Sequence, residues 1–204
     1  MKILIACEFS GVVRRAFRDR GHDAWSCDLL PAEDRDKHHI QGDVLKVLRE
    51  GWTGMVAHPP CTRLANSGVR WLHVPPPGKT VEDMWDEFRE GVEFYLAIRN
   101  APIRYKAIEN PVMHRYARDA IGHIERNIVQ PWWFGEPCFK ATGFELHGGW
   151  TPLVPTNMLT PPKPGTEEHK QWSWVHRASP GPDRWKERSR TLPGVAKAMA
   201  TQWG

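Results

Sequence analysis

The sequence contains no long apolar run and no paired cysteine motif. No stretch approaches the ~18 apolar residues that a membrane span needs, and the first apolar run, residues 3–6, is too short for a signal peptide. No two histidines flank a glutamate at helical spacing, so we expect no metal site. We therefore expect a cytoplasmic protein with no membrane partner. Its cysteines are too widely spaced for a zinc knuckle or a disulfide framework and are expected to be free thiols: Cys7, Cys27, Cys61 and Cys138.

The composition is that of a folded protein, with 25% charged and 40% hydrophobic residues in a chain of 204. This length falls in the range of one domain with a continuous core. The net charge of +4 suits a polyanionic partner, although many enzymes with neutral substrates are equally basic. The 11 tryptophans could form core, stack on adenine or stack on unpaired bases, and composition does not decide among these roles.

The N-terminal region has the pattern that opens a nucleotide-binding unit. Residues 2–6 predict a strand, a Ser-Gly turn follows, and residues 12–20 carry apolar residues at helical spacing. Residues 22–28 predict a second strand that ends on Asp28. An acid about 20 residues after the glycine turn is placed to hold the two hydroxyls of a ribose. Gly42-Asp43-Val44 begins a further short segment.

A cysteine and a glutamate follow two other predicted strands. Residues 55–57 run directly into two prolines and Cys61, and two consecutive prolines end a helix or a central strand. Residues 105–108 predict a strand that runs into Glu109. Carboxyl ends of parallel strands share one edge of a sheet, so Asp28, Cys61 and Glu109 are predicted to lie along it. A thiolate beside an acid can add across an aromatic ring while the opposite ring nitrogen gains a proton.

The rest of the chain completes a predicted α/β fold. Residues 80–99 and 114–127 predict helices, and residues 127–130 and 132–146 predict strands. Proline, tryptophan and basic residues dominate from residue 150 to 193 with little periodicity, and residues 193–203 predict a closing helix. We therefore expect a mostly parallel sheet with helices on both faces.

Four short segments resemble motifs of a known enzyme family. Phe9-Ser10-Gly11 is similar to Phe-x-Gly, Gly42-Asp43-Val44 to Gly-Asp-Ile, Pro60-Cys61 to Pro-Cys, and Glu109-Asn110-Pro111 to Glu-Asn-Val. In this order they resemble the cytosine-5 DNA methyltransferases. Three positions depart from the family pattern: Val13 and Arg14 replace further glycines, and Thr62 replaces a glutamine.

The resemblance extends to the C-terminus. Residues 134–142 are similar to the family's Phe-Gly-x-Pro-Gln-x-Arg-x-Arg, with Lys140 and Thr142 in place of the two arginines. Residues 193–199 are similar to the final helix that completes the cofactor pocket. Only about 40 residues separate Trp150 from Arg190, where the family has a long target-recognition domain. The chain thus resembles a short, phage-like form from a bacterial or phage-infected cell, with residues 1–204 as one catalytic domain and residues 150–190 as a reduced substrate-contacting segment.

This resemblance implies a Rossmann-like fold, S-adenosylmethionine as cofactor and DNA, including single-stranded DNA, as substrate. It implies Cys61 as the nucleophile, Glu109 on cytosine N3, and Lys140 as the substitute for a family arginine. Cofactor contacts are expected from Phe9, Ser10, Gly11, Asp28, Asp43, Pro59 and Ala196. Substrate contacts are expected from Pro60, Thr62, Asn110, Thr142, Arg184, Lys186 and Arg188.

The chemistry explains why these residue types are needed. Carbon 5 of cytosine is too weak a nucleophile to take a methyl group directly. Addition of a thiolate at carbon 6, with a proton or hydrogen bond at N3, turns carbon 5 into an enamine-like carbanion that attacks a sulfonium methyl. Elimination of the cysteine then restores the ring.

Each candidate residue also has a structural interpretation. Cys61 could be an inert thiol, Glu109 a salt-bridged acid, Asp28 a strand end and Asp43 a turn residue. The other three cysteines are expected to be structural. The aromatic cluster 132–134 could be core or a wall of the base pocket, and the basic run 184–190 could be a solvated face or a phosphate contact.

Three functions therefore stay open. The first is methylation of cytosine carbon 5 in DNA, with the base flipped out of the helix and an accessory protein as a possible aid to target recognition. The second is the same chemistry on a free cytosine nucleotide, which would explain the missing recognition domain. The third is a catalytically inactive module that binds nucleic acid or protein.

Overall fold

A computed structural model describes residues 1–179, 181 and 184–204. Within these residues the strands form one seven-stranded sheet in the order β3-β2-β1-β4-β5-β7-β6. In the described part of the sheet, β7 runs antiparallel to both of its neighbours and the other pairs are parallel. The strands are β1 (Lys2–Ala6), β2 (Asp23–Asp28), β3 (His39–Gln41), β4 (Gly54–Ala57), β5 (Tyr105–Asn110), β6 (Asn127–Val129) and β7 (Thr142–His147).

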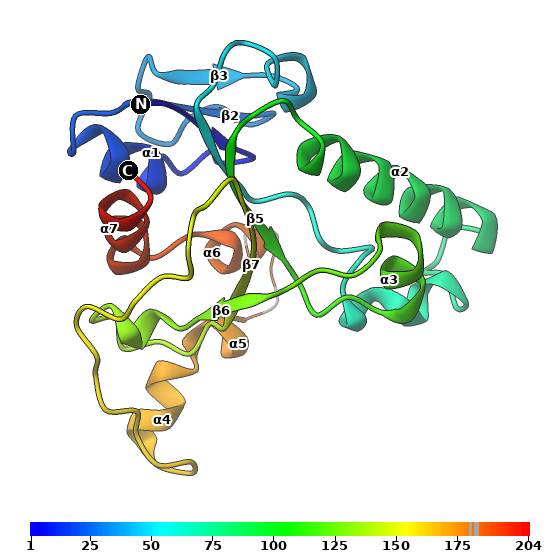
Figure 1. Ribbon diagram of the computed structural model, residues 1–204. Coiled ribbons are helices and arrows are strands. Elements are labelled where there is room, and N and C mark those ends of the chain that lie inside the picture. Colours follow the sequence, from blue (N-terminus) through cyan, green and yellow to red (C-terminus); the bar gives the residue numbers. More distant parts are fainter. Residues whose placement is uncertain (180, 182–183) are drawn as a thin grey trace.

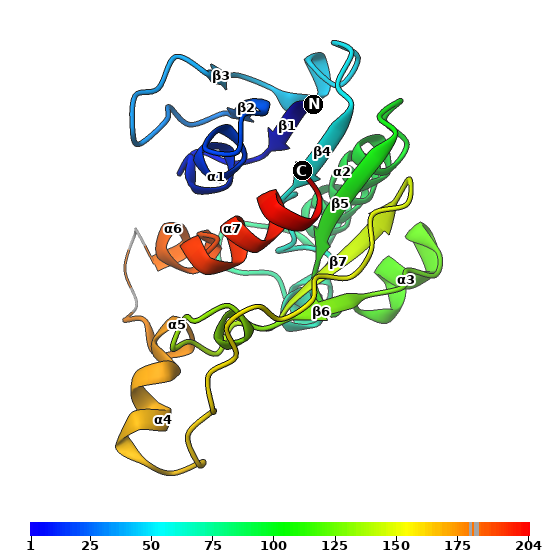
Figure 2. The ribbon, with the colours of Figure 1, turned by 60° about the vertical axis from the view of Figure 1, so that its left-hand side comes forward.

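Helices cover both faces of this sheet (Figure 1). The α-helices are α1 (Val12–Arg18), α2 (Val81–Arg99), α3 (Arg115–Ile121), α4 (Glu167–Trp172), α5 (Trp174–Arg177), α6 (Arg184–Ser189) and α7 (Pro193–Gln202), and the 3-10 turns are η1 (Val44–Lys46), η2 (Asn66–Leu72) and η3 (Pro131–Trp133). Helices α1 and α7 pack together on one face, and α2 and α3 lie on the other (Figures 1 and 2).

The alternation of side chains along β1 explains these two layers. Ile3 and Ile5 belong to the core beneath α1 and α7, whereas Leu4 and Ala6 belong to the core beneath α2. Successive strand residues point to opposite faces, and a strand buried on both faces reads as a continuous apolar run. The predicted Rossmann-like α/β fold, with a mostly parallel sheet between two helical layers, is confirmed.

The long helix and the closing helix are also confirmed. Thr80 caps α2, and Asp83 completes a capping box with it. Helix α7 begins at Pro193, and beyond its end Trp203 stacks on Trp150 at a centroid distance of 5.3 Å. The indole N–H of Trp203 donates to the Thr151 carbonyl (2.9 Å), so these aromatics form core and anchor the chain end.

Several boundaries differ from the prediction. Strand β5 continues through Glu109 and Asn110, because both pair with β7. Helix α3 ends at Ile121, before Gly122 at φ 89°. Residues 131–141 form a 3-10 turn and a loop rather than a paired strand. Strand β3 was not predicted, and neither were α4, α5 and α6, which are too short to show a helical period.

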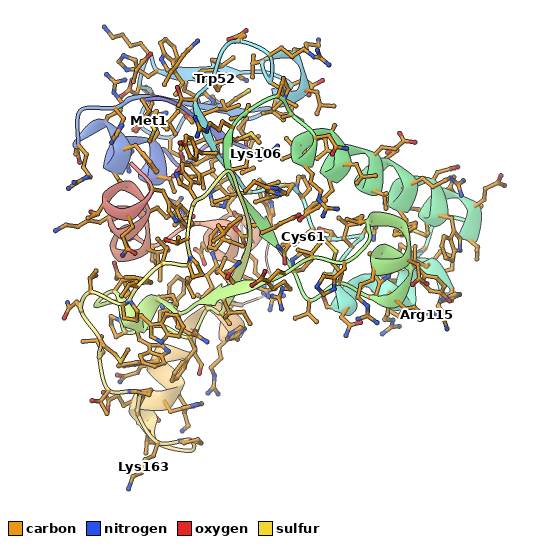
Figure 3. The ribbon with its side chains drawn as sticks, viewed as in Figure 1. Met1, Trp52, Cys61, Lys106, Arg115 and Lys163 are labelled. Carbon is orange, nitrogen blue, oxygen red and sulfur yellow. The ribbon has the colours of Figure 1, made fainter. Side chains whose placement is uncertain are left out.

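The segment 150–190 leaves the sheet and returns. Its α4 projects furthest from the sheet, with Lys163 near the tip (Figures 2 and 3). Residues 180, 182 and 183 of this segment lie outside the described residues. Across the part of the chain that the structure describes, no helix is both long and apolar enough to span a membrane.

Candidate functional site

The candidate site lies at the carboxyl ends of the central strands. The strand order reverses between β1 and β4, and ligands of open α/β sheets bind at such a switch point. The His58 N–H donates to the Ala6 carbonyl (2.9 Å), which ties the two departing loops together. Cys61 lies at this end of the sheet, away from Lys106 at the start of β5 (Figure 3).

Glu8, which sequence reasoning missed, occupies the N-terminus of α1. Its buried carboxylate accepts hydrogen bonds from the Val13 N–H (2.7 Å), the Arg14 N–H (3.2 Å) and the Ser10 hydroxyl (3.2 Å). Free N–H groups at a helix start would otherwise bind an anion such as a pyrophosphate. The carboxylate of the chain itself fills that position, so this fold does not bind a dinucleotide phosphate there. The sequence feature that could have identified Glu8 is an acidic residue just before a glycine turn.

The predicted glycine turn is closed by an ion pair between a buried arginine and a carboxylate at the surface. Gly11 has φ 70°, and a Cβ there would lie 2.5 Å from Arg14 Nη2. Arg14 is fully buried, donates to Ser26 Oγ (2.6 Å) and pairs with Asp34 (2.5 Å), which also binds Arg15. The Arg14 that replaces a family glycine therefore shapes the turn from inside. Ser10 and Gly11 define this loop, and both are buried.

Asp28 and Asp43 lie on the acidic side of the site. Both are half-buried, and each accepts one local backbone N–H, from Leu30 (2.9 Å) and Leu45 (3.0 Å). Carboxylates have further acceptor capacity. Burial raises the pKa of the Cys7 thiol, and the charges of Asp28, Cys27 and Asp43 raise it further, so these groups lie close together.

These carboxylates suit a cofactor that carries hydroxyls and a positive charge better than one that carries a phosphate. Two carboxylates suit the hydroxyls of a nucleoside and the positive charge of a sulfonium, while Glu8 occupies the place of a phosphate. The predicted contact Phe9 is buried beneath the exposed Trp185 of α6, at a centroid distance of 5.8 Å. Of the other predicted cofactor contacts, Ala196 is fully buried in the core that it shares with Val13 and Phe17 of α1, and Pro59 is also buried.

On the β4–β5 side of the site, the central contact is a hydrogen bond between His58 and Glu109. His58 Nδ1 lies 2.7 Å from Glu109 Oε2. Burial favours the neutral Glu109 acid, but the hydrogen bond and charge of His58, with the charge of Lys140, lower the pKa of this carboxyl overall. An ionised carboxylate only accepts, so Nδ1 carries the proton. The Nε2 atom of His58 is buried and has no hydrogen-bond partner among the described residues.

Cys61 lies on a tight loop beside this pair. Its carbonyl accepts from the Leu64 N–H (3.0 Å) and the Ala65 N–H (2.9 Å). The loop folds back so closely that a Cβ at Gly68 would overlap the Thr62 carbonyl oxygen. Cys61 is reached by solvent, but protein encloses one side of the sulfur. This partial burial and the charge of Glu109 raise the thiol pKa, against the opposing charges of Arg188 and Lys140.

Lys140 closes the site from the loop before β7. Its Nζ donates to the Arg190 carbonyl (2.6 Å). Burial lowers the pKa of Lys140, while the neighbouring charge of Glu109 acts in the opposite direction. Glu109, Lys140 and Thr142 line a cavity of about 10 Å³, room for about one water molecule.

The charges of Glu109, Lys140 and Arg188 all act on Cys61, so these four predicted residues lie near one another, whereas Asn110 does not join them. Asn110 is buried, and its Oδ1 accepts from Arg126 Nε (2.9 Å), a partner that sequence reasoning missed. The Asn110 amide therefore braces β5. Pro60 and Thr62 lie on the Cys61 loop, where Pro60 is exposed and Thr62 is also open to solvent.

The basic segment reaches the site through α6. Arg184 Nε donates to the Ala178 carbonyl (2.8 Å), and Lys186 Nζ lies 5.7 Å from the centre of the Trp185 ring. Arg190 pairs with Glu33 (2.5 Å), which holds the end of this segment over the sheet edge. Trp185 and Trp174 are exposed.

Other predicted aromatics and cysteines are structural. Trp172 is buried against Phe139, so it offers no stacking face. Phe134 of the aromatic cluster is buried core. Cys27 and Cys138 are buried, and burial raises the pKa of both thiols to about 11. A search of the described residues finds no group of three or more His, Cys, Asp or Glu side chains that could hold a metal ion.

Known proteins offer only structural similarity. No family model matches the chain, and no curated protein matches it significantly. The chain is similar to a structure described as a candidate DNA modification methyltransferase encoded within a prophage of E. coli, with 16% identity, a TM-score of 0.41, and 72% of this chain and 46% of that chain covered. It is also similar to the Entamoeba histolytica methyltransferase EhMeth, with 14% identity, a TM-score of 0.46, and 80% and 57% covered. The chain thus spans about half the length of these structures.

Proposed function

We propose that the chain transfers a methyl group from S-adenosylmethionine to carbon 5 of cytosine in DNA, through a covalent bond to Cys61. The observation that carries this proposal is the meeting of three groups at one sheet edge. Cys61 is open to solvent, Glu109 is held beside it by His58, and Lys140 approaches from the loop before β7. A nucleophile, a carboxylate and a cation in one place are the groups that addition to a pyrimidine ring requires.

The residues of the chain divide the reaction among them. Cys61 sulfur bonds to carbon 6 and N3 gains a proton, so one proton moves from sulfur to nitrogen. Burial and the charge of Glu109 raise the thiol pKa of Cys61 overall, and the charges of Lys140 and Arg188 oppose that rise and so favour the thiolate. The Glu109 carboxylate accepts a hydrogen bond from protonated N3.

The later steps return the enzyme to its starting state. Bound S-adenosylmethionine supplies an electrophilic methyl group, and carbon 5 gains it. The carbon 5 proton then passes to water, the bond between carbon 6 and the Cys61 sulfur breaks, and the N3 proton returns to sulfur.

The acidic side of the site would hold the cofactor. Asp28 has further acceptor capacity for the ribose hydroxyls, and Asp43 has further acceptor capacity for the amino group of adenine. The charges of Glu8, Asp28 and Asp43 favour a sulfonium over an anion. Phe9, Ser10 and Gly11 would form the wall of this pocket.

The α6 segment favours DNA over a free nucleotide. Arg184, Lys186 and Arg188 bring positive charge to the mouth of the site, and Trp185 is 51% exposed beside them. Such groups contact phosphates and stack on unpaired bases without reading sequence. We therefore expect base flipping, weak sequence preference and a preference for single-stranded or distorted DNA.

The test is transfer of labelled methyl from S-adenosylmethionine to duplex DNA, single-stranded DNA and dCMP in parallel, followed by nucleoside analysis. We expect 5-methylcytosine in DNA, at higher yield from the single strand. Label in dCMP alone would favour the nucleotide enzyme. No label in any substrate, despite cofactor binding by calorimetry, would favour the inactive binding module.

A further inference from the structure

His58 is not among the residues that the motif resemblance selects, yet it makes a short hydrogen bond to the central carboxylate of the reaction side. It is the first residue after β4, and Glu109 lies 51 positions later in β5. Its backbone N–H is fixed to Ala6, and its side chain is 11% exposed. The backbone and the imidazole ring of His58 are therefore both fixed in position. The Nδ1–H can then point at Glu109 Oε2 without a further loss of conformational entropy.

The groups around Glu109 come from four elements. His58 approaches from the β4 end, Cys61 from the loop that follows, and Lys140 from the loop before β7. Arg188 of α6 acts on both Cys61 and Lys140. Lys140 already donates to the Arg190 carbonyl, whereas His58 gives its hydrogen bond to Glu109 itself.

We propose that His58 is a positioning residue that holds Glu109 as a carboxylate aimed at the base. This inference rests on the proposed function. With Oε2 bound to His58, Oε1 can accept from the 4-amino group of cytosine and from N3 once that atom is protonated. A pyrimidine with a carbonyl at position 4 would face the same carboxylate with an acceptor and would be rejected.

Removal of His58 should change the state of Glu109 in a definite direction. Burial alone favours the neutral acid, and the hydrogen bond and charge of His58, with the charge of Lys140, outweigh it. Without that bond the Glu109 pKa rises, and the carboxyl group is free to turn. His58→Asn keeps an N–H near the position of Nδ1, whereas His58→Leu removes the donor and keeps apolar bulk.

The first experiment needs neither cofactor nor DNA. Nitrogen chemical shifts of the His58 imidazole in the ligand-free protein report which ring nitrogen carries the proton, and His58→Asn identifies the signal by its loss. We expect Nδ1 to carry the proton that it directs at Glu109 Oε2. A bare Nδ1 with a protonated Nε2 would overturn the proposal, because Glu109 would then have no donor.

The second experiment measures methyl transfer against pH for the parent, His58→Asn and His58→Leu. We expect His58→Leu to lose about 10- to 100-fold in kcat, to move the acid limb to higher pH, and to change KM for DNA by less than about threefold. His58→Asn should recover most of this loss and keep the parent's acid limb. Equal losses in both variants with unmoved profiles would reduce His58 to packing and overturn the proposal.

Failure of the proposed function gives a different result from failure of this inference. If the parent methylates no substrate, the proposed function is wrong, and the nitrogen shifts still decide whether His58 holds Glu109. If the parent methylates cytosine but the variants behave alike, the function stands and the role of His58 falls.

Discussion

The two sides of the sheet edge use their charged residues differently. On the β1–β2 side, the buried charged side chains are paired with other groups of the chain. On the β4–β5 side, the charged side chains lie around an exposed cysteine. Glu8 takes three hydrogen bonds from the start of α1, and Arg14 is paired with Asp34. By contrast, Cys61 is open to solvent and His58 Nε2 has no partner among the described residues. The first side is a fixed scaffold with Asp28 and Asp43 at its rim. The second keeps its reactive groups available.

The largest effect on activity should come from Cys61, on the β4–β5 side of the sheet edge. We expect Cys61→Ser to reduce methyl transfer at least about 1,000-fold, because a serine hydroxyl is a far weaker nucleophile at neutral pH. The melting temperature should stay within about 2 °C of the parent, since Cys61 is exposed. The matched control is Cys138→Ser, which alters a buried thiol and should reduce stability more than activity. Unchanged transfer by Cys61→Ser would mean direct methylation of an amino group.

On the β1–β2 side, where the charges are paired, loss of the Asp34 charge should reduce stability and not activity. Among the described residues, Asp34→Asn leaves the buried Arg14 with Asp36, at 3.9 Å, as its one carboxylate partner, and we expect a loss of about 3 kcal/mol in the free energy of unfolding. The control Asp119→Asn breaks an exposed pair with Arg115 and should cost less than about 0.5 kcal/mol. Chemical denaturation measures both, and equal losses would contradict the role given to Arg14.

The same pair predicts a dependence on pH. Burial opposes ionisation of Asp34, but its hydrogen bonds to Arg14 and Arg15 lower its pKa overall. A lowered folded-state pKa stabilises the protein above the ordinary aspartate pKa of about 3.9, and this contribution is lost as the pH falls below it. The parent should therefore lose stability more steeply than Asp34→Asn in acid. Parallel curves would contradict this account.

A smaller effect is expected at the rim of the scaffold. Asp28→Asn should weaken S-adenosylmethionine binding about tenfold in calorimetry, because a hydrogen bond to a charged acceptor is replaced by one to a neutral group. Asp23→Asn, at the exposed start of the same strand, is the matched control and should leave affinity unchanged. Equal affinity in both variants would remove Asp28 from the cofactor site.

The smallest effect should come from α6. Replacing Arg184, Lys186 and Arg188 with alanine should raise the DNA dissociation constant several-fold near 0.1 M salt. The slope of log binding constant against log salt concentration should become shallower, by up to about 0.9 for each phosphate that the variant no longer neutralises. Cofactor affinity should not change. The control pair Lys163→Ala and Lys170→Ala, in and near the projecting α4, should have less effect. Unchanged DNA binding by the triple variant would make α6 a structural flap.

Local pattern was enough to predict the elements that build the site edge. The short apolar runs of β1 and β4, the cap at Thr80, and the prolines before Cys61 each act over a few residues, so they are visible in sequence. Cys61 and Glu109 were placed together by topology alone, because parallel strands present their carboxyl ends at one edge.

Contacts between distant residues could not be predicted in the same way. His58 and Glu109 are 51 positions apart, and Arg126 reaches back 16 positions to Asn110. Ala196 was assigned to the cofactor by motif alone, and its burial where α7 packs on α1 depends on contacts between opposite ends of the chain. Glu8 carries no period or spacing of its own, and its role depends on where α1 begins.

The most direct measurement uses single-stranded DNA in which 5-fluorocytosine replaces cytosine. Fluorine at carbon 5 cannot leave as a proton does, so the bond between carbon 6 and the nucleophile cannot be released after methyl transfer. With S-adenosylmethionine present, we expect mass spectrometry to find DNA linked to the peptide that carries Cys61, and no linkage in Cys61→Ser. Methylated cytosine from ordinary DNA, without any trapped peptide from the fluorinated strand, would contradict a covalent mechanism through Cys61.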